Sequence, residues 1–412
     1  MSESKRNIPE LRFPEFTGEW EEKKLGEIVE FSKGKYLGKK DLSEKGVKCI
    51  LYGELYTKYG PIITDIYSST NADKKLLKEG KYNQILIPSS GETSVDIATA
   101  SSIEFDNEFY IGGDINILEP KIDKGTFISL SLNGVNKLNL SKYAQGKSVV
   151  HIYNNDIKKL KISMAVELEE QEKIGTFFSK LDRLIELEEK KYELLEQQKR
   201  GYMQKIFSQE LRFKDENGND YPEWEVHKLG TLYKIGKAGG TPKSTERKYY
   251  NGEIPFLSIS DITEQGKYIY NTEKSITQEG LDNSSAWLVP KYSINYAMYA
   301  SVGYLSINKI DLATSQAIFN MYFDDYKLTE YVYYYLNYIR EIRLLEKLVG
   351  TNTQSNLSAL IMRDLDINLT INEERYKIIK LLNFFDFLNK KQSSKIKKLK
   401  HRKKALLQKM FV

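Results

Sequence analysis

The sequence has little cysteine and histidine. Its 412 residues include one cysteine, Cys49, and three histidines, His151, His227 and His401. A single cysteine excludes an internal disulfide and any metal site built from several cysteines. The histidines are too scattered to suggest paired metal ligands. Metal catalysis by this chain is therefore not expected.

Long apolar runs are also missing. The longest nearly uncharged run, around Tyr292 to Asn308, is rich in Ser, Asn and Tyr and would leave too many polar groups in lipid to span a bilayer. The first ten residues, MSESKRNIPE, contain no apolar segment of the kind found in a secretory signal. We expect a cytoplasmic protein with no membrane partner.

A strong excess of one charge is absent too. The net charge of +5 comes from 62 basic and 57 acidic residues, so the overall balance permits a polyanionic partner without indicating one. The length and the 40% hydrophobic content are sufficient for two or three globular domains.

The sequence contains a long-period internal repeat. "GEWEEKKLG" at 18–26 returns as "PEWEVHKLG" at 222–230 with six of nine positions identical, and Trp20 and Trp224 are 204 positions apart. The same offset returns much later, where "EEQEKIGTFFSKLDRLI" at 169–185 matches a segment beginning "NEERYKIIKLL" at 372. The chain therefore consists of two related halves.

Both late segments predict long helices with a coiled-coil seam. In the first, apolar residues recur with heptad spacing at positions 174, 178, 181, 185, 192, 195, 202 and 206, and the second repeats this pattern from Ile378 to Met410. Polar residues interrupt both seams at matching places, Glu188 with Gln392 and Lys199 with Lys403. A helix of about 40 residues would be about 60 Å long.

The two predicted helices differ in charge. Residues 167–207 carry ten acidic and eight basic residues, whereas residues 390–412 carry ten Lys or Arg and no acid. This favours antiparallel pairing, which would place Glu186 near Lys398, Glu189 near Lys395 and Glu193 near Lys391. A solvated helix face and a nucleic-acid-binding arm remain alternatives for the basic segment.

Between the repeated parts lie two segments, roughly 27–165 and 231–366, that share no convincing identity with each other. Both read as short strands with Gly-rich turns. Aromatic and basic residues are interleaved in "FSKGKYLGKKD" at 31–41 and "TPKSTERKYYNGE" at 241–253. Such stretches suit phosphate contacts, although a solvated loop with core tyrosines is an equally simple interpretation.

Enzymatic signatures are missing. "SKYAQGKS" at 141–148 ends like a phosphate-binding P-loop, but Ser141 stands where the first glycine must be. No dinucleotide-binding glycine motif, nucleophile elbow or amino-methyltransferase motif occurs. The sequence therefore predicts a protein that binds and does not catalyse.

Taken together, these residues resemble the specificity (S) subunits of type I restriction-modification systems. "GGTPKSTERKYYNGEIPFLSISDI" from 239 is similar to the opening of many target-recognition domains of that family, and "LEEQEKIGTFFSKLDRLI" is similar to its central helical region. The first variable segment departs from this pattern, with "SKGKYLGKKD" in place of the Gly-Gly-Thr-Pro opening.

The resemblance implies an α+β fold: two globular mixed α/β target-recognition domains related by a pseudo-twofold repeat and separated by two long antiparallel coiled-coil helices. The expected parts are a first target-recognition domain (1–165), a central conserved helix (166–210), a second target-recognition domain (211–366) and a distal conserved helix (367–412). It also implies double-stranded DNA, two modification (methyltransferase) subunits and restriction (translocase/nuclease) subunits as partners. No cofactor is expected in this chain; S-adenosylmethionine and ATP are expected in the partner subunits.

We predict that loop residues of each domain contact DNA, with polar side chains at base edges and lysines at phosphates. In the first domain these are Lys33, Lys35, Tyr36, Ser89, Ser90, Glu92, Thr93, Lys147 and His151. In the second they are Thr241, Lys243, Ser244, Ser258, Ser260, Asp261, Gln316, Asn352 and Gln354.

Two other functions remain open on the sequence alone. One is a coiled-coil adaptor that presents two protein-binding domains without any nucleic acid. The other is a fused restriction enzyme, which would need catalytic motifs that the sequence does not display.

Overall fold

The computed structural model describes residues 7–299, 301–344 and 359–412. The chain divides into two compact units. The first comprises residues up to Lys190 together with Ser393–Val412, and the second comprises Lys191–Gln392. Each unit therefore contains part of both long helices, α7 (Leu168–Phe207) and α14 (Asn372–Lys409). The four-part division expected from the sequence stays a prediction.

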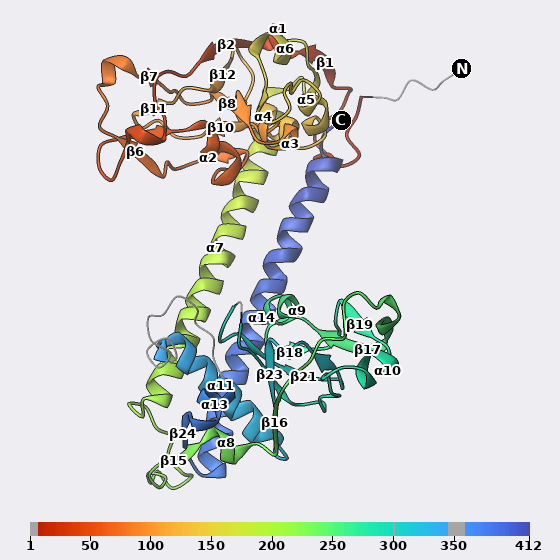
Figure 1. Ribbon diagram of the computed structural model, residues 1–412. Coiled ribbons are helices and arrows are strands. Elements are labelled where there is room, and N and C mark those ends of the chain that lie inside the picture. Colours follow the sequence, from red (N-terminus) through yellow and green to blue (C-terminus); the bar gives the residue numbers. More distant parts are fainter. Residues whose placement is uncertain (1–6, 300, 345–358) are drawn as a thin grey trace. The chain divides into compact units, whose positions relative to one another are not determined.

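The first unit contains two mixed sheets (Figure 1). Its main sheet has the order β2-β12-β8-β10-β5, with bounds Val29–Lys33, Ile115–Pro120, Ile85–Pro88, Ser101–Ile103 and Ile62–Ile63. Its second sheet has the order β3-β6-β4-β11-β7, with bounds Leu42–Ser43, Ser68–Thr70, Val47–Ile50, Phe109–Ile111 and Lys78–Glu79. Two strand pairs complete it: β1 (Glu21–Lys24) with β14 (Lys161–Met164), and β9 (Ser90–Gly91) with β13 (Val150–His151).

The shorter helices of the first unit surround these sheets. They are α1 (Leu25–Ile28), α2 (Tyr52–Thr57), α3 (Ser94–Ile97), α4 (Gly125–Asn133), α5 (Lys137–Ser141) and α6 (Asn154–Ile157). Nearly every residue of α4 is buried, because this helix packs between the main sheet and α7. A separate apolar cluster, which includes Ile50, Ile111 and Ile117, fills the space between the two sheets.

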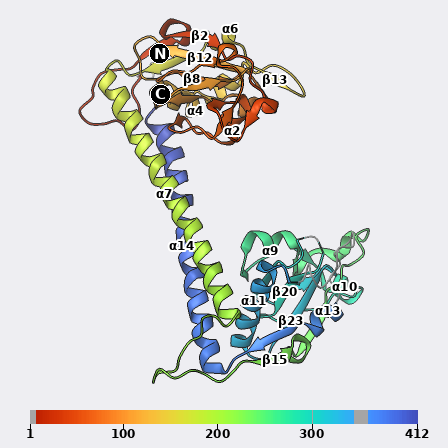
Figure 2. The same ribbon diagram turned by 90° about the vertical axis from the view of Figure 1, so that its left-hand side faces the viewer.

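The second unit repeats this plan. Its main sheet has the order β16-β23-β20-β21-β18, with bounds Ile235–Ala238, Ile318–Tyr322, Ile294–Ala297, Leu305–Asn308 and Tyr268–Ile269. Its second sheet has the order β19-β17-β22, with bounds Lys274–Ile276, Tyr250–Leu257 and Ala313–Thr314. Strand β15 (Glu225–Lys228) pairs with β24 (Asp366–Leu369). The shorter helices among the described residues of this unit are α8 (Leu229–Leu232), α9 (Ile259–Gln265), α10 (Gln278–Asp282), α11 (Tyr326–Glu341) and α13 (Ala359–Asp364). Figure 2 shows α11 between the sheet and α14.

The main sheets of the two units have the same topology. In both, the first three strand pairings along the sheet are antiparallel and the last is parallel. The variable segments that share no convincing identity therefore fold alike. The predicted fold class is confirmed in its two mixed α/β domains and its paired long helices.

The repeated Trp motif has one structural role in both units. Trp20 Nε1 donates to Glu170 Oε2 over 3.2 Å, and Trp224 Nε1 donates to Glu374 Oε2 over 3.0 Å. Arg12 and Arg212 also donate to these two carboxylates, over 2.6 Å and 2.8 Å. The motif returns because each unit needs it to hold the start of a long helix.

Within each unit, the segments of α7 and α14 run side by side in opposite directions. In the first unit Lys403 pairs with Asp182 over 2.5 Å, and in the second Lys199 pairs with Asp386 over the same distance. These are equivalent pairs of the 204-residue repeat. The lysines predicted as interruptions of the seam are thus neutralised by the facing helix.

The ion-pair partners predicted from the sequence are wrong in detail. Lys395 pairs with Glu188 and Lys400 with Glu189, each over 2.6 Å. Glu186 instead pairs with Arg183 of its own helix. None of the three predicted pairs is among the ion pairs of the described residues. The antiparallel direction is right, but a shift of one residue turns a side chain by about 100° around a helix and changes its partner.

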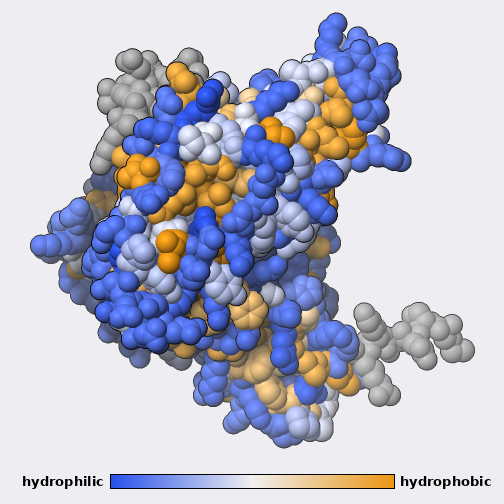
Figure 3. All heavy atoms as spheres, turned by 90° about the horizontal axis from the view of Figure 1, so that it is seen from below, coloured by the Kyte–Doolittle hydropathy of each residue, from blue (hydrophilic) through white to orange (hydrophobic). Residues whose placement is uncertain are grey.

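The described helices include none that is long and apolar enough to cross a membrane. Hydrophilic residues cover most of the face seen in Figure 3, and apolar residues gather there in patches between them.

Candidate nucleic-acid interface

The Gly-Gly-Thr-Pro segment of the second unit is pressed between strand β22 and the loop that follows α10. A Cβ atom on Gly239 would lie 2.1 Å from Thr314 Oγ1, and one on Gly240 would lie 2.2 Å from Ser285 Oγ. The Gly240 N–H donates to the carbonyl of Thr314 over 2.9 Å. Glycine is required at both positions because no side chain fits between this strand and this loop.

This packing brings together, at the surface, some of the residues predicted to contact DNA, which are called reading residues below. Thr241 follows the glycine pair, and its hydroxyl donates to Gln316 Oε1 over 2.5 Å. Both side chains are exposed, as are Lys243 and Ser244 in the same loop. Residues far apart in the sequence thus form one polar surface, to which Thr241 and Gln316 contribute directly.

A buried asparagine supports this surface from below. Asn320 on β23 is fully buried, and its side-chain amide donates to Thr314 Oγ1 over 2.8 Å and to the Lys237 carbonyl over 3.3 Å. Thr314 in turn holds Gly240. Asn320 is not predictable from the sequence, because an asparagine inside a strand carries no signal of its burial or its partner.

Three other predicted residues of the second unit lie at the start of α9, and two of them cap it. Ser258 is the N-cap of α9, and the Asp261 carboxylate accepts hydrogen bonds from the backbone of Ser258 over 2.8 Å and of Glu273 over 3.1 Å. Asp261 is only 5% exposed, whereas Ser260 is exposed. This geometry favours a structural role for Ser258 and Asp261.

In the first unit, the structure brings four predicted residues near one another. Strand β9 pairs with β13 so that Ser90 lies opposite His151, and Ser90 Oγ is 3.0 Å from His151 Nδ1. The His151 ring stacks on Tyr153, and Lys33 Nζ lies 5.9 Å from the centre of the same tyrosine ring. Ser89 is buried beside them, and its carbonyl accepts from the Ile152 N–H. Tyr153, 46% exposed, was missed by the sequence analysis.

The remaining predicted residues of the first unit occupy exposed loops. Tyr36 is 59% exposed, and its φ of +63° turns the chain sharply next to Lys35. Glu92 is exposed, and Thr93 caps α3 through a hydrogen bond from the Asp96 N–H. Lys147 lies on the exposed loop before β13. These residues are not in contact with the group around His151 in any described side-chain interaction.

The lysines predicted to contact phosphate keep their charge available. In the described part of the chain, Lys33, Lys35, Lys147 and Lys243 take part in no ion pair, and all four are exposed. A lysine without an acidic partner can neutralise a phosphate without first giving up another contact. Asn352 and Gln354 lie outside the described residues.

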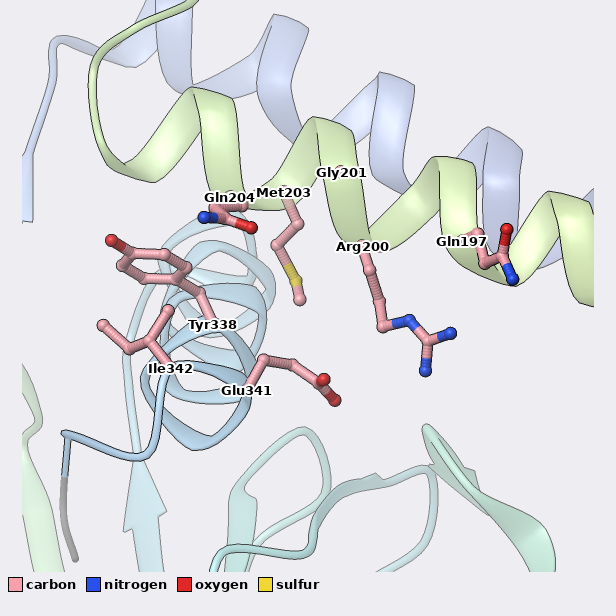
Figure 4. A pocket seen from close by; sticks show the side chains of 8 residues that line it. All are labelled: Gln197, Arg200, Gly201, Met203, Gln204, Tyr338, Glu341 and Ile342. Atoms are coloured by element: carbon pink, nitrogen blue, oxygen red, sulfur yellow. The ribbon is translucent and has the colours of Figure 1, made fainter. Parts of the chain in front are cut away.

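A groove of about 350 Å³ lies elsewhere in the second unit, between α7 and the end of α11 (Figure 4). Met203 and Tyr338 form part of its wall, and Arg200 and Glu341 lie at its edge. None of the predicted reading residues that the structure describes lines it.

Comparison with known proteins identifies the family. A model of the type I restriction modification DNA specificity domain matches residues 17–197 and again residues 221–399, which together make up most of the chain. The chain belongs to this specificity family. The double match corresponds to the two units that share one sheet topology.

Individual members of the specificity family are distant relatives of this chain. The MjaX type I restriction enzyme specificity subunit of Methanocaldococcus jannaschii is 26% identical, over 97% of this chain and 95% of its own. The MjaIX specificity subunit of the same organism is 29% identical over 46% of this chain and 45% of its own, so this match spans about half of either protein. A type I S subunit from M. genitalium has a similar fold, with a TM-score of 0.60 at 16% identity over 98% of this chain and 99% of its own.

Membership in the specificity family decides between the functions left open by the sequence. The family is the DNA-recognition component of type I systems and is not catalytic. This confirms the interpretation of the chain as a DNA-recognition protein and not an enzyme. It sets aside the adaptor without nucleic acid and the fused restriction enzyme.

Proposed function

We propose that this chain reads one asymmetric, two-part DNA sequence, with one half read by each unit. The observation that carries this proposal is that the two units have the same sheet topology but different surface loops. The first unit presents Ser90, His151 and Tyr153, whereas the second presents the Gly-Gly-Thr-Pro loop with Gln316. Because the two units share a fold but differ in the side chains they present, we expect them to recognise different base sequences.

The long helices would then set the gap between the half-sites. At about 1.5 Å per residue, α7 with its 40 residues is about 60 Å long. Two readers on one face of a duplex should be about one helical turn apart, about 34–36 Å, which a helix of this length can span. Shortening both helices should shorten the preferred gap.

The proposed complex supplies the chemistry. Two modification subunits would dock on the helices and bring S-adenosylmethionine for adenine methylation, and restriction subunits would bring ATP-driven translocation and cleavage. The chain itself would hold neither cofactor. A protein with these partners would work beside the chromosome in the cytoplasm. Support for this assembly comes from the membership of the chain in the specificity family.

Mapping of methylated adenines in cells with and without this gene tests the proposal. The expected result is one asymmetric two-part motif that loses methylation when the gene is removed. Identical methylation in the two strains, with the modification subunits present, would contradict it. A gel shift of the chain with its modification partner on random duplex, at low and raised salt, tests DNA binding directly.

A further inference from the structure

A buried lysine joins the main sheet of the second unit to the long helices. Lys267 directly precedes β18, and its side chain is only 9% exposed. Its ammonium donates to Glu330 Oε1 over 2.9 Å and to Asn383 Oδ1 over 2.5 Å. Glu330 belongs to α11 and Asn383 to α14, so one side chain bridges three elements.

Two further groups extend this network to α7. The Tyr334 hydroxyl, 2.9 Å from Lys267 Nζ, donates to Asp386 Oδ2 over 2.5 Å. Asp386 also pairs with Lys199 of α7 over 2.5 Å. All these residues belong to the second unit, which the network therefore ties to both of its helix segments.

Charge is retained inside this network. Burial alone would raise the pKa of Glu330, but the nearby Lys267 ammonium and hydrogen bonds from Tyr268, Lys267 and Asn383 bring it below its ordinary value. Burial lowers the pKa of Lys267, and the charges of Glu330 and Asp386 oppose that shift. The pair stays bound because each partner stabilises the charged form of the other.

In the first unit, the equivalent contact between the main sheet and the neighbouring helix is made by neutral groups. Strand β5 corresponds to β18 in sheet order, and it is preceded by Pro61, whose carbonyl accepts from Ser129 Oγ on α4 over 2.6 Å. Ser129 and Glu330 are each the fifth residue of their helix. Asp182, the counterpart of Asp386 in the repeat, pairs with Lys403. The ionic bridge is thus a property of the second unit.

Buried ion pairs contribute little net stability, but they demand one geometry, because a displaced partner leaves a charge buried without compensation. Apolar contacts and single neutral hydrogen bonds tolerate small sliding motions better. We propose that Lys267 is a positioning residue that sets the orientation of the main sheet of the second unit on that unit's segments of the long helices. It thereby sets how strictly the gap between the two half-sites is recognised. This inference rests on the proposed function.

The test uses the full chain with its modification subunits. The variant Lys267→Met with Glu330→Gln removes both charges, so neither ion is left unpaired, and glutamine can still accept from Tyr268. The measurement is methylation of duplexes that carry both half-sites at the natural gap or at gaps one base pair shorter and longer. We expect the preference for the natural gap to fall about tenfold, with unchanged half-site sequences.

The matched control is Lys234→Met with Asp324→Asn, which removes an exposed ion pair from the same unit. It should keep the wild-type gap preference. A second variant, Asn383→Ser, removes one contact of Lys267 and keeps every charge, so it serves if the double variant fails to fold. It should relax the gap preference in the same direction.

Two results would overturn the proposal at different levels. If folded Lys267 and Asn383 variants discriminate gaps as well as the wild type, Lys267 does not position the unit. If the wild-type complex methylates DNA without regard to sequence, the proposed function itself is wrong. A relaxed gap preference in the variants, with wild-type behaviour in the control, supports the positioning role.

Discussion

Two glutamates at equivalent places in the repeat, Glu170 and Glu374, are fully buried at the starts of the long helices. Each accepts hydrogen bonds from an arginine and a tryptophan of its own unit. A buried carboxylate without such donors would destabilise the fold, so the tryptophan motif and the helix glutamates depend on each other.

The acid dependence of the second unit should follow from Glu374. Burial would raise its pKa, but donors from Arg212, Thr370 and Trp224 bring it below its ordinary value. A lowered folded-state pKa gives stability that is present above the unfolded-state pKa and is lost as pH falls through the folded value. We expect Glu374→Gln to flatten this acid-side loss in urea unfolding across pH 3–7. Glu373→Gln alters the exposed neighbouring carboxylate and is the matched control, and equal profiles for both variants would contradict the assignment.

The reading loop of the second unit should not tolerate a single added methyl group. In Gly240→Ala the new Cβ would meet Ser285 Oγ at 2.2 Å and the Ala286 nitrogen at 2.4 Å, so the loop must move. We expect recognition of the second half-site to weaken about tenfold or more, because the side chains that read bases are displaced by the shift. Methylation assays with altered second half-sites measure this effect. Gly201→Ala, whose Cβ would meet open space, should behave as wild type.

The phosphate role predicted for Lys243 can be checked by salt dependence. Lys243→Ala should weaken binding to all sequences alike and reduce the slope of log affinity against log salt by about one. Lys248→Ala, which removes a lysine already paired with Glu279, should change the slope less. An unchanged slope for Lys243→Ala would remove this residue from the phosphate contacts.

At the scale of elements, each unit completes its core with a phenylalanine at or just after the end of a long helix. Phe411, after the end of α14, contacts Trp20 and Phe127 in the first unit. Phe207, at the end of α7, contacts Trp224 and Tyr331 in the second. These phenylalanines are 204 positions apart, like the two tryptophans they touch. The last two residues of the repeated "QKIF" and "QKMF" segments are therefore core residues.

Loss of this contact should destabilise the first unit. Phe411 is 3% exposed, and truncation of a buried phenylalanine typically costs about 3–5 kcal/mol. We expect Phe411→Ala to lower the free energy of unfolding by an amount in this range, measured by urea denaturation. Phe387→Ala changes a residue of the same helix that is 60% exposed, and it should cost less than about 0.5 kcal/mol. Similar costs for the two variants would contradict the packing role of Phe411.

At the scale of the whole molecule, the two units combine one topology with separate reading surfaces. Their main sheets pair strands in the same order and directions, whereas the loops that carry the predicted reading residues differ. Such a design lets a half-site change without any change in the scaffold.

Segment exchange tests this modular arrangement. Replacing residues 27–165 with the corresponding segment of a relative should change one half-site of the methylated motif and leave the other as it was. Replacing residues 231–366 should change only the other half. The measurement is motif mapping by sequencing of methylated adenines. A change in both half-sites after a single exchange would contradict independent reading.

The sequence by itself determined the features that rest on local pattern. Heptad spacing predicted both long helices, opposite charge predicted their antiparallel pairing, and the 204-residue offset predicted two equivalent units. The adjacent glycines at 239 and 240 marked the loop that the structure places beside Gln316. Periodicity and spacing are readable in one sequence because they depend on neighbours along the chain.

The tertiary structure alone decided which distant groups meet. It gave both diverged segments one sheet topology and paired Glu189 with Lys400 of the facing helix. It also placed Lys267 among partners from two helices, α11 and α14. Such contacts join residues tens to hundreds of positions apart, and they are selected by the packing of whole elements, which leaves no local trace in the sequence.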